Sequence, residues 1–363
     1  MSIESDLRKE GIEVIAPVPT LTINSLAKSV SEKLCAAFPE LNLDGQDLFI
    51  ELSRLSMFTA SMPEGVAEAN YFYKNSSVYL REGVNLSCVQ PTVVHELIHH
   101  LQALRDKDGE LIRLGFCEFG EFKTYAMGLN EGAVQLMASH CLKEQSDIVK
   151  YYDLSFPTTS QTYYPLLCNL VAQMAYITGT EYLYKSAFFS TDDFKNRFSE
   201  LCGEKAYFRI VRNLDTVFYT EEKIVQLKNQ FLTEKSSQKT QKIATRIDEL
   251  RKKMKEIFLQ TQNLIFTSYF NTEFKKLNTT EDIEVYRTQL YNYQNYIAIA
   301  EGYTTFHVYY INQMANLEAK HESILNNTAL VLVQPNKLIR LLQAIRKLWT
   351  KQTSSTVELD NWK

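Results

Sequence analysis

Two histidines and a glutamate stand at a spacing that suits metal-assisted hydrolysis. They belong to the segment His95-Glu-Leu-Ile-His99, an HExxH motif. Residues four apart on a helix lie on one face, so both imidazoles can bind one metal ion. Glu96 is turned by about 100° from His95, which places its carboxylate beside the metal as a base for a water molecule. The motif therefore predicts a metal site on a helix.

A catalytic zinc ion takes three protein ligands, so a third ligand must come from elsewhere in the chain. We prefer Glu131, within Gly128-Leu-Asn-Glu-Gly-Ala-Val-Gln135, because it falls on a predicted helix. Gln135 lies one turn further along and can support a ligand from behind. Glu118 and Glu121 stay open as alternatives in a glycine-containing segment, since zinc also accepts carboxylates from loops.

The pair Asn130-Glu131 downstream of HExxH resembles the gluzincin group of zinc metallopeptidases, in which a glutamate on a second helix is the third ligand. The resemblance covers about residues 66–142. Two features depart from thermolysin-like members: the gap between positions 99 and 131 is 32 residues, which is longer, and Gln135 replaces an aspartate. The resemblance implies a divergent or unassigned branch with one Zn²⁺ per chain.

The same resemblance implies an activity and a substrate. The activity is peptide-bond hydrolysis with Glu96 as general base, and the substrate is a peptide or a protein. In zincin folds a strand before the active-site helix pairs with extended substrate. Here either Tyr71–Tyr73 or Val78–Leu80 would be that edge strand, and an ordinary hairpin explains these residues equally well.

A hydrolase of this kind also needs a hydrogen-bond donor for the tetrahedral oxyanion. Four tyrosines flank the ligand segments: Tyr125, Tyr163, Tyr164 and Tyr176. Aromatic residues at helical spacing more often build a core than take part in catalysis. We keep Tyr125 and Tyr164 as candidate donors, and Asn130 and Gln135 as candidate supports of the metal ligands.

The other histidines and the cysteines have no ligand spacing. His100 points away from His99 and is expected at the surface or behind the ligands. We expect structural roles for His140, His307 and His321. The six cysteines are scattered without a CxxC pair, which favours a reducing compartment over a disulfide framework.

Hydrophobic periodicity predicts an α+β protein that is predominantly α-helical. We expect the active-site helix at about 91–105, the third-ligand helix at about 125–142 and a further helix from Pro165 to near Gly179. Upstream segments have helical spacing at 26–38 and 48–58, a strand pattern at 12–16 and a β-hairpin pattern at 69–81. Together these elements predict a zincin-like catalytic domain over residues 1–215.

Residues 216–363 form a region of another character, rich in Lys and Glu. Its apolar spacing predicts long antiparallel helices. Segment 337–351 is expected to form a basic amphipathic helix that could contact a partner or an anionic membrane surface. Packing of its apolar face on the rest of the domain is the commoner use of such a helix.

Composition excludes several classes of protein. With 363 residues, 45% of them hydrophobic and 23% charged, the chain is globular rather than disordered. A formal net charge of -4 offers no global basic field, so we expect no nucleic-acid partner. The absence of an apolar run of membrane-spanning length and of a signal-peptide pattern predicts a cytoplasmic protein without a transmembrane segment.

Two alternative functions stay open. One is a catalytically silent interaction protein built on a zincin scaffold, and an intact Glu96 argues against it because such a protein needs no base. The other is a metal-dependent hydrolase that acts on a non-peptide amide. A screen of peptides against small amides would separate the second alternative from a peptidase.

Overall fold

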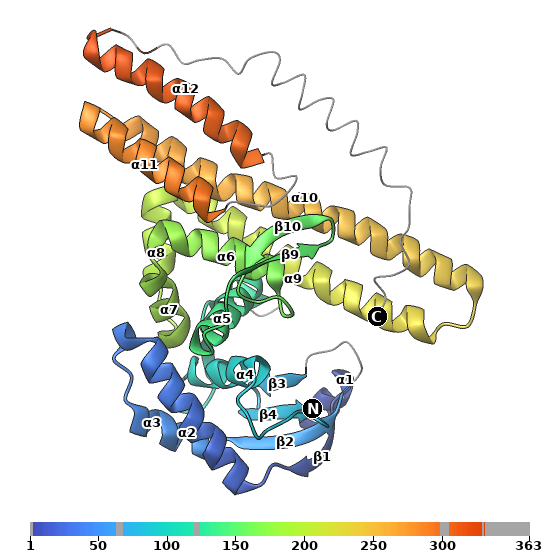
Figure 1. Ribbon diagram of the computed structural model, residues 1–363. Coiled ribbons are helices and arrows are strands. Elements are labelled where there is room, and N and C mark those ends of the chain that lie inside the picture. Colours follow the sequence, from blue (N-terminus) through green and yellow to red (C-terminus); the bar gives the residue numbers. More distant parts are fainter. Residues whose placement is uncertain (1–2, 63–67, 120–123, 298–304, 329, 331–363) are drawn as a thin grey trace. The chain divides into compact units, whose positions relative to one another are not determined.

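The fold is α+β and predominantly helical, as predicted (Figure 1). The structure is a computed structural model that describes residues 3–62, 68–119, 124–297, 305–328 and 330. Its contacts divide the described chain into two units, one up to Thr272 and one from Glu273 onward. The division that we predicted between residues 215 and 216 falls inside a continuous helix, α9 (Glu204–Thr233).

A four-stranded sheet lies at the base of the first unit. Its strands are β1 (Glu13–Pro17), β2 (Ser56–Ser61), β3 (Ala69–Phe72) and β4 (Ser77–Arg81). They follow the order β1-β2-β4-β3, in which the β2–β4 pair is parallel and the other two pairs are antiparallel. The hairpin prediction is thus confirmed. Tyr71 lies on the edge strand β3, whereas Val78–Leu80 belong to β4, which is paired on both sides and cannot be that edge.

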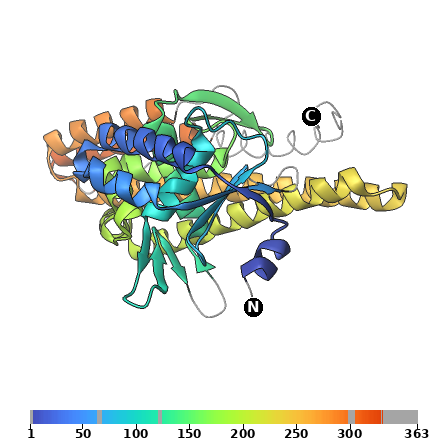
Figure 2. The same cartoon turned by 90° about the horizontal axis from the view of Figure 1, so that it is seen from below.

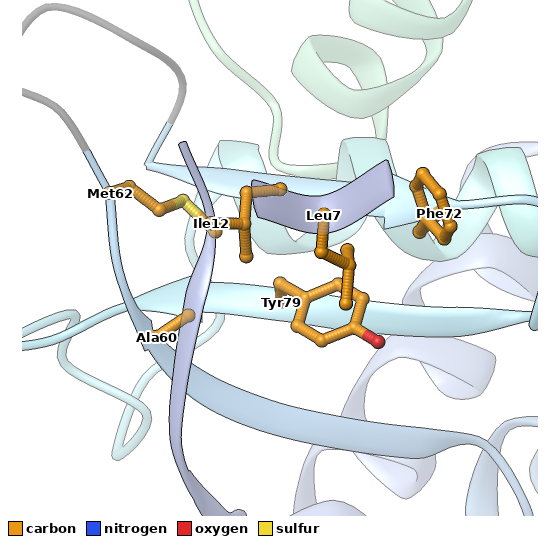
Figure 3. Packing of buried hydrophobic residues seen from close by; sticks show 6 residues of the cluster. All are labelled: Leu7, Ile12, Ala60, Met62, Phe72 and Tyr79. Atoms are coloured by element: carbon orange, nitrogen blue, oxygen red, sulfur yellow. The ribbon is translucent and has the colours of Figure 1, made fainter. Parts of the chain in front are cut away.

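The two faces of this sheet pack against different helices. Figure 3 shows Leu7 of α1 (Ile3–Lys9) close to Tyr79 on one face, within a cluster that also contains Ile12, Ala60, Met62 and Phe72. Side chains alternate along a strand, so Tyr71 and Val78 point to the other face. That face is covered by α4 (Pro91–Leu101), the helix that carries the HExxH motif.

The helical prediction for 48–58 is wrong beyond residue 53. Helices α2 (Thr20–Ala37) and α3 (Gly45–Ser53) form, with the short 3-10 turn η1 (Pro39–Leu41) between them. The chain then enters β2, where Met57 and Ala60 are buried between two neighbouring strands. Strand pairing decides the structure there, because tertiary contacts override a local apolar spacing.

The predicted active-site helix at 91–105 is too long. Helix α4 ends at Leu101, and Ala103–Arg105 forms β5. An antiparallel meander follows (Figure 2), whose further strands are β6 (Leu111–Leu114), β7 (Cys117–Phe119) and β8 (Thr124–Tyr125). Each strand pairs with the next one along the chain. Leu104 fits the helical spacing, yet its side chain is exposed on the strand. The periodicity therefore continued past the real end of the helix.

Helix α5 (Met127–Cys141) confirms the helix predicted at about 125–142 and is almost wholly buried. Two glycines let neighbouring helices approach its backbone. A Cβ on Gly128 would lie 2.3 Å from the Leu214 carbonyl oxygen, and one on Gly132 would lie 2.8 Å from Val171 Cγ2. These close approaches hold α5 between α9 and α6 (Pro165–Thr178), the helix predicted to end near Gly179.

The remaining elements of the first unit are helices and one hairpin. They are β9 (Asp147–Tyr151), β10 (Leu154–Thr158), α7 (Thr180–Phe189), α8 (Asp193–Cys202) and the part of α10 (Ser237–Lys276) up to Thr272. Helices α9 and α10 are long and run antiparallel, side by side in both views (Figures 1 and 2). The prediction of long antiparallel helices is confirmed here.

The second unit contains another antiparallel pair, α11 (Thr280–Tyr296) and α12 (Thr305–Leu325). The Tyr286 hydroxyl donates to Gln313 Oε1 at 3.2 Å, and the Tyr293 and Phe306 rings lie 5.1 Å apart. The segment 337–351, predicted to be a basic amphipathic helix, lies outside the described residues. None of the helices in the described ranges is long and apolar enough to cross a membrane.

Candidate metal centre

Helices α4 and α5 bring the three predicted ligands together. His95 Nε2 lies 2.9 Å from His99 Nε2 and 3.1 Å from Glu131 Oε2, and His99 Nε2 lies 3.4 Å from Glu131 Oε1. One ligand atom from each residue lies within 4.8 Å of the other two, and all three residues are buried. We call these residues the ligand group. Two imidazoles and one carboxylate converging on one point could hold a metal ion.

The alternative third ligands do not join this group in the part of the chain that the structure describes. Glu118 lies on β7 with 58% of its side chain exposed, 3.8 Å from the ammonium nitrogen of Lys195. Glu121 lies outside the described residues. Glu131 was preferred because it falls on a helix, and that helix is what carries it into contact with His95 and His99.

Within the ligand group, His99 and Glu131 shift each other's pKa. Burial lowers the pKa of His99, but the Glu131 carboxylate outweighs burial and raises this pKa to about 9. Burial in turn raises the pKa of Glu131, yet His99 and His95 hold it well below its usual range. At neutral pH His99 therefore holds a proton beside the Glu131 carboxylate. A divalent cation would compete with that proton for the same position.

Each imidazole has a glutamine behind it. Gln135 Oε1 lies 2.9 Å from His95 Nδ1, the supporting position predicted for it. Gln102 Oε1 lies 2.7 Å from His99 Nδ1, and this residue was missed by the sequence analysis. The signal was present, because Gln102 follows His99 by three positions and such residues share a helix face. Spacing alone does not show that the Gln102 side chain turns back onto the imidazole, so the residue was not singled out.

Asn130 supports the ligands indirectly. Its Oδ1 accepts from the Phe116 backbone N–H at 3.0 Å, and its Nδ2 donates to Gln102 Oε1 at 3.2 Å. The side chain is fully buried. Asn130 therefore reaches His99 through Gln102, rather than through a bond of its own to an imidazole.

The carboxylate of Glu96 faces the edge strand of the sheet. Glu96 is half-buried, and its Oε2 accepts from the Tyr71 backbone N–H of β3 at 2.6 Å. The neighbouring His100 points elsewhere, with Nε2 3.1 Å from Glu51 Oε1 of α3 and its ring 5.6 Å from the Tyr71 ring. Glu96 is thus a carboxylate of α4 that lies outside the ligand group.

Tyr164 lies against the ligand group. It precedes α6, and its ring centre is 6.1 Å from that of His95. Burial, assisted by the Glu131 charge, raises the pKa of Tyr164 well above its usual range, so the hydroxyl keeps its proton. Tyr125 is 53% exposed on β8, and the Tyr163 hydroxyl donates to Glu68 Oε2 at 2.8 Å. Tyr164 therefore places its ring, with a protonated hydroxyl, next to a residue of the ligand group.

The start of α5 is capped by a residue distant in sequence. Asp215 of α9 accepts from the Gly128 N–H at 3.0 Å and from the Ala126 N–H at 3.1 Å. The helix has no side-chain cap of its own, and a carboxylate at a helix N-terminus is favourable. Asp215 thus anchors the end of the helix nearest Glu131. No sequence signal connects these two residues.

The other histidines lie outside the ligand group. His140 Nε2 is 3.1 Å from the Ala37 carbonyl oxygen, His307 is exposed and His321 is half-buried. All six cysteines lie in the described ranges, and none of them forms a disulfide there. The chain has no match among protein-family models, curated proteins or solved structures.

Proposed function

We propose that this protein is a zinc-dependent hydrolase of peptide bonds, as its resemblance to the gluzincins implies. The observation that carries the proposal is a buried group of two histidines and one glutamate beside a separate carboxylate, Glu96, that faces an edge strand. Two histidines and one glutamate are a known ligand set of catalytic zinc. Oxygen atoms behind both imidazoles, from Gln102 and Gln135, also fit zinc, because they orient the rings.

The residues around the ligand group divide the chemistry between them. Zinc would supply Lewis-acid assistance to the scissile carbonyl and to water. Glu96 would remove a proton from the attacking water and deliver it to the leaving amine. The Tyr164 hydroxyl, protonated because burial raises its pKa, would donate to the oxyanion.

The edge strand β3 suits the binding of an extended peptide. The Arg81 N–H donates to the Glu68 carbonyl at 2.8 Å, and pairing alternates along an antiparallel ladder. The backbone groups of Ala69 and Tyr71 therefore face away from β4, on the side where Glu96 lies. A peptide added to this edge would place its own backbone beside Glu96.

Glu96→Gln tests the proposal. The amide keeps an acceptor for the Tyr71 N–H and cannot take a proton from water, so zinc content should stay unchanged. Cleavage of a peptide mixture by the zinc-loaded protein should fall about 10²- to 10⁴-fold. Glu118→Gln is the matched control on the exposed surface and should cleave like the wild type.

Other outcomes would select the alternatives. Zinc-loaded wild-type protein that hydrolyses small amides and no peptide would favour the non-peptide hydrolase. Zinc-loaded protein that hydrolyses neither, with an unchanged cellular activity in Glu96→Gln, would favour the interaction protein and overturn the proposal.

A further inference from the structure

The side chain of Gln102 turns back from the end of α4 and uses all of its hydrogen-bonding capacity. Its Oε1 lies 2.7 Å from His99 Nδ1 and accepts from Asn130 Nδ2 at 3.2 Å. Its Nε2 donates to Asn130 Oδ1 at 3.1 Å and to the Ala187 carbonyl at 2.9 Å. Gln102 and Asn130 form a reciprocal pair of buried amides, which we call the amide pair.

Backbone groups fix the orientation of both amides. The Ala187 carbonyl can only accept, so the Gln102 atom that faces it must be the nitrogen Nε2. The Phe116 N–H can only donate, so the Asn130 atom that faces it must be the oxygen Oδ1. The orientation of the amide pair thus follows from the backbone and not from the imidazole itself.

This orientation determines the tautomer of His99. The oxygen Oε1 of Gln102 faces His99 Nδ1 and can only accept, so Nδ1 must carry a proton. The lone pair of a neutral His99 then lies on Nε2, the nitrogen that points into the ligand group. The amide orientation of Gln135 is not fixed in this way, because its Nε2 is buried without a hydrogen-bond partner among the described residues.

We propose that Gln102 is a positioning residue that locks His99 in the tautomer able to bind metal and couples it to the segment before Glu131. The coupling passes through Asn130, which immediately precedes Glu131 on α5. Two of the three ligands are therefore held by one pair of amides. The inference deepens the proposed function and rests on its metal site.

A turn of the β-meander fits closely against the amide pair. A Cβ on Gly115 would lie 2.0 Å from Gln102 Nε2 and 2.1 Å from Asn130 Oδ1. The Gly115 N–H also donates to Ser190 Oγ at 2.8 Å, and that hydroxyl donates to the Gln102 carbonyl at 2.7 Å. Gly115 contacts no ligand in this network, yet a side chain there would displace both amides.

The test compares zinc affinity among size-matched variants, by competition with a chromophoric chelator at pH 7.5. Gln102→Met keeps the volume and removes the acceptor, so affinity should fall about 10- to 100-fold. Gln102→Glu keeps an acceptor for the His99 Nδ1–H but loses the Nε2 donors to Asn130 and Ala187, so it should bind zinc more weakly than the wild type and more tightly than Gln102→Met. A purely structural role would not separate Met from Glu in this order.

A second pair of variants keeps the inference testable if Gln102 variants fail to fold. Gly115→Ala should weaken zinc binding by displacing the amide pair. Gly109→Ala is its control, because Gly109 also has a positive φ of +84° and its Cβ would meet nothing within 4 Å. The control should bind zinc like the wild type.

The outcomes separate this inference from the proposed function. Equal zinc affinity in wild type, Gln102→Met and Gly115→Ala would overturn the positioning role of Gln102. The proposed hydrolase function would be unaffected by that result. Tight zinc binding that depends on Gln102, in a protein that cleaves no peptide, would support the positioning role and count against the peptidase. A wild-type protein that binds no zinc would overturn both.

Discussion

At the scale of single residues, protons and a metal ion compete for one small volume. His95, His99 and Glu131 are buried in mutual contact, and the Glu131 carboxylate raises the pKa of His99. In the metal-free protein the positive charge in this group is an imidazolium proton. In the proposed metal-bound protein the charge would come from the cation, which requires neutral histidines. The pH dependence of stability should therefore differ between the two forms.

The first prediction concerns this dependence. The pKa of His99 is raised to about 9, so its contribution to metal-free stability is complete below pH 6.5 and is lost as pH rises through about 9. Zinc binding displaces that proton, so the stabilisation by zinc should increase from pH 6 to pH 9. Thermal unfolding at fixed free zinc measures it, and about 2.7 kcal/mol is expected at 100 times Kd. Stabilisation by zinc that is independent of pH would contradict this assignment.

The second prediction concerns the oxyanion donor. Tyr164→Phe removes the hydroxyl and keeps the ring against His95, so kcat should fall about 10²- to 10³-fold. Zinc affinity should stay unchanged, because the hydroxyl is not a ligand. Tyr125→Phe, at an exposed position, is the control and should leave kcat unchanged. Loss of zinc instead of kcat in Tyr164→Phe would give Tyr164 a structural role.

At the scale of elements, the site depends on two helices that the sequence predicts and on contacts that it does not. Apolar spacing located α4 and α5, and HExxH with Asn130-Glu131 located the ligands on them. The end of α4 could not be predicted, because Leu104 continues its spacing into a strand. The role of Gln102 could not be predicted either, because it depends on a side-chain contact that spacing alone does not show. Asp215 acts from a different helix, and only the fold brings it to α5.

The third prediction concerns that cap. Asp215→Ala leaves the Ala126 and Gly128 N–H groups without their acceptor, at a cost of about 1 to 2 kcal/mol in the free energy of unfolding. Zinc affinity should also fall, because α5 carries Glu131. Asp44→Ala removes the cap of α3, which accepts from the Gln46 and Asp47 N–H groups. This control should lose stability and keep its zinc affinity. Equal zinc affinity in the two variants would dissociate the cap from the site.

At the scale of the whole molecule, the candidate metal centre and the residues described around it belong to the unit that ends at Thr272. The sequence predicted its helix-rich character and the β3–β4 hairpin. It left open whether Tyr71–Tyr73 or Val78–Leu80 would be the edge strand, because strand order depends on contacts between distant segments. The helices of this unit also bury a carboxyl group. Glu221 of α9 is buried, with its Oε1 bonded to the Tyr151 hydroxyl of the β9–β10 hairpin.

The fourth prediction concerns the buried carboxyl group of Glu221. Burial raises the pKa of Glu221, so the folded protein holds this proton more tightly than the unfolded chain does. The contribution of Glu221 to the free energy of unfolding is fully present below pH 4.5 and is lost as pH rises through the pKa of the folded protein. Glu221→Gln removes the effect, so its gain in unfolding free energy over wild type should grow from pH 5 to pH 8. Glu249→Gln, on an exposed surface of α10, should show no such trend.

The most direct test of the central claim is the metal content of protein purified without a metal-affinity tag. Mass spectrometry should find about one zinc per chain in the wild type and in Glu118→Ala. Zinc should be lost or weakly held in Glu131→Ala, because that carboxylate completes the ligand group. No stoichiometric metal after zinc reconstitution, or equal zinc in all three proteins, would contradict the claim that His95, His99 and Glu131 form a zinc site.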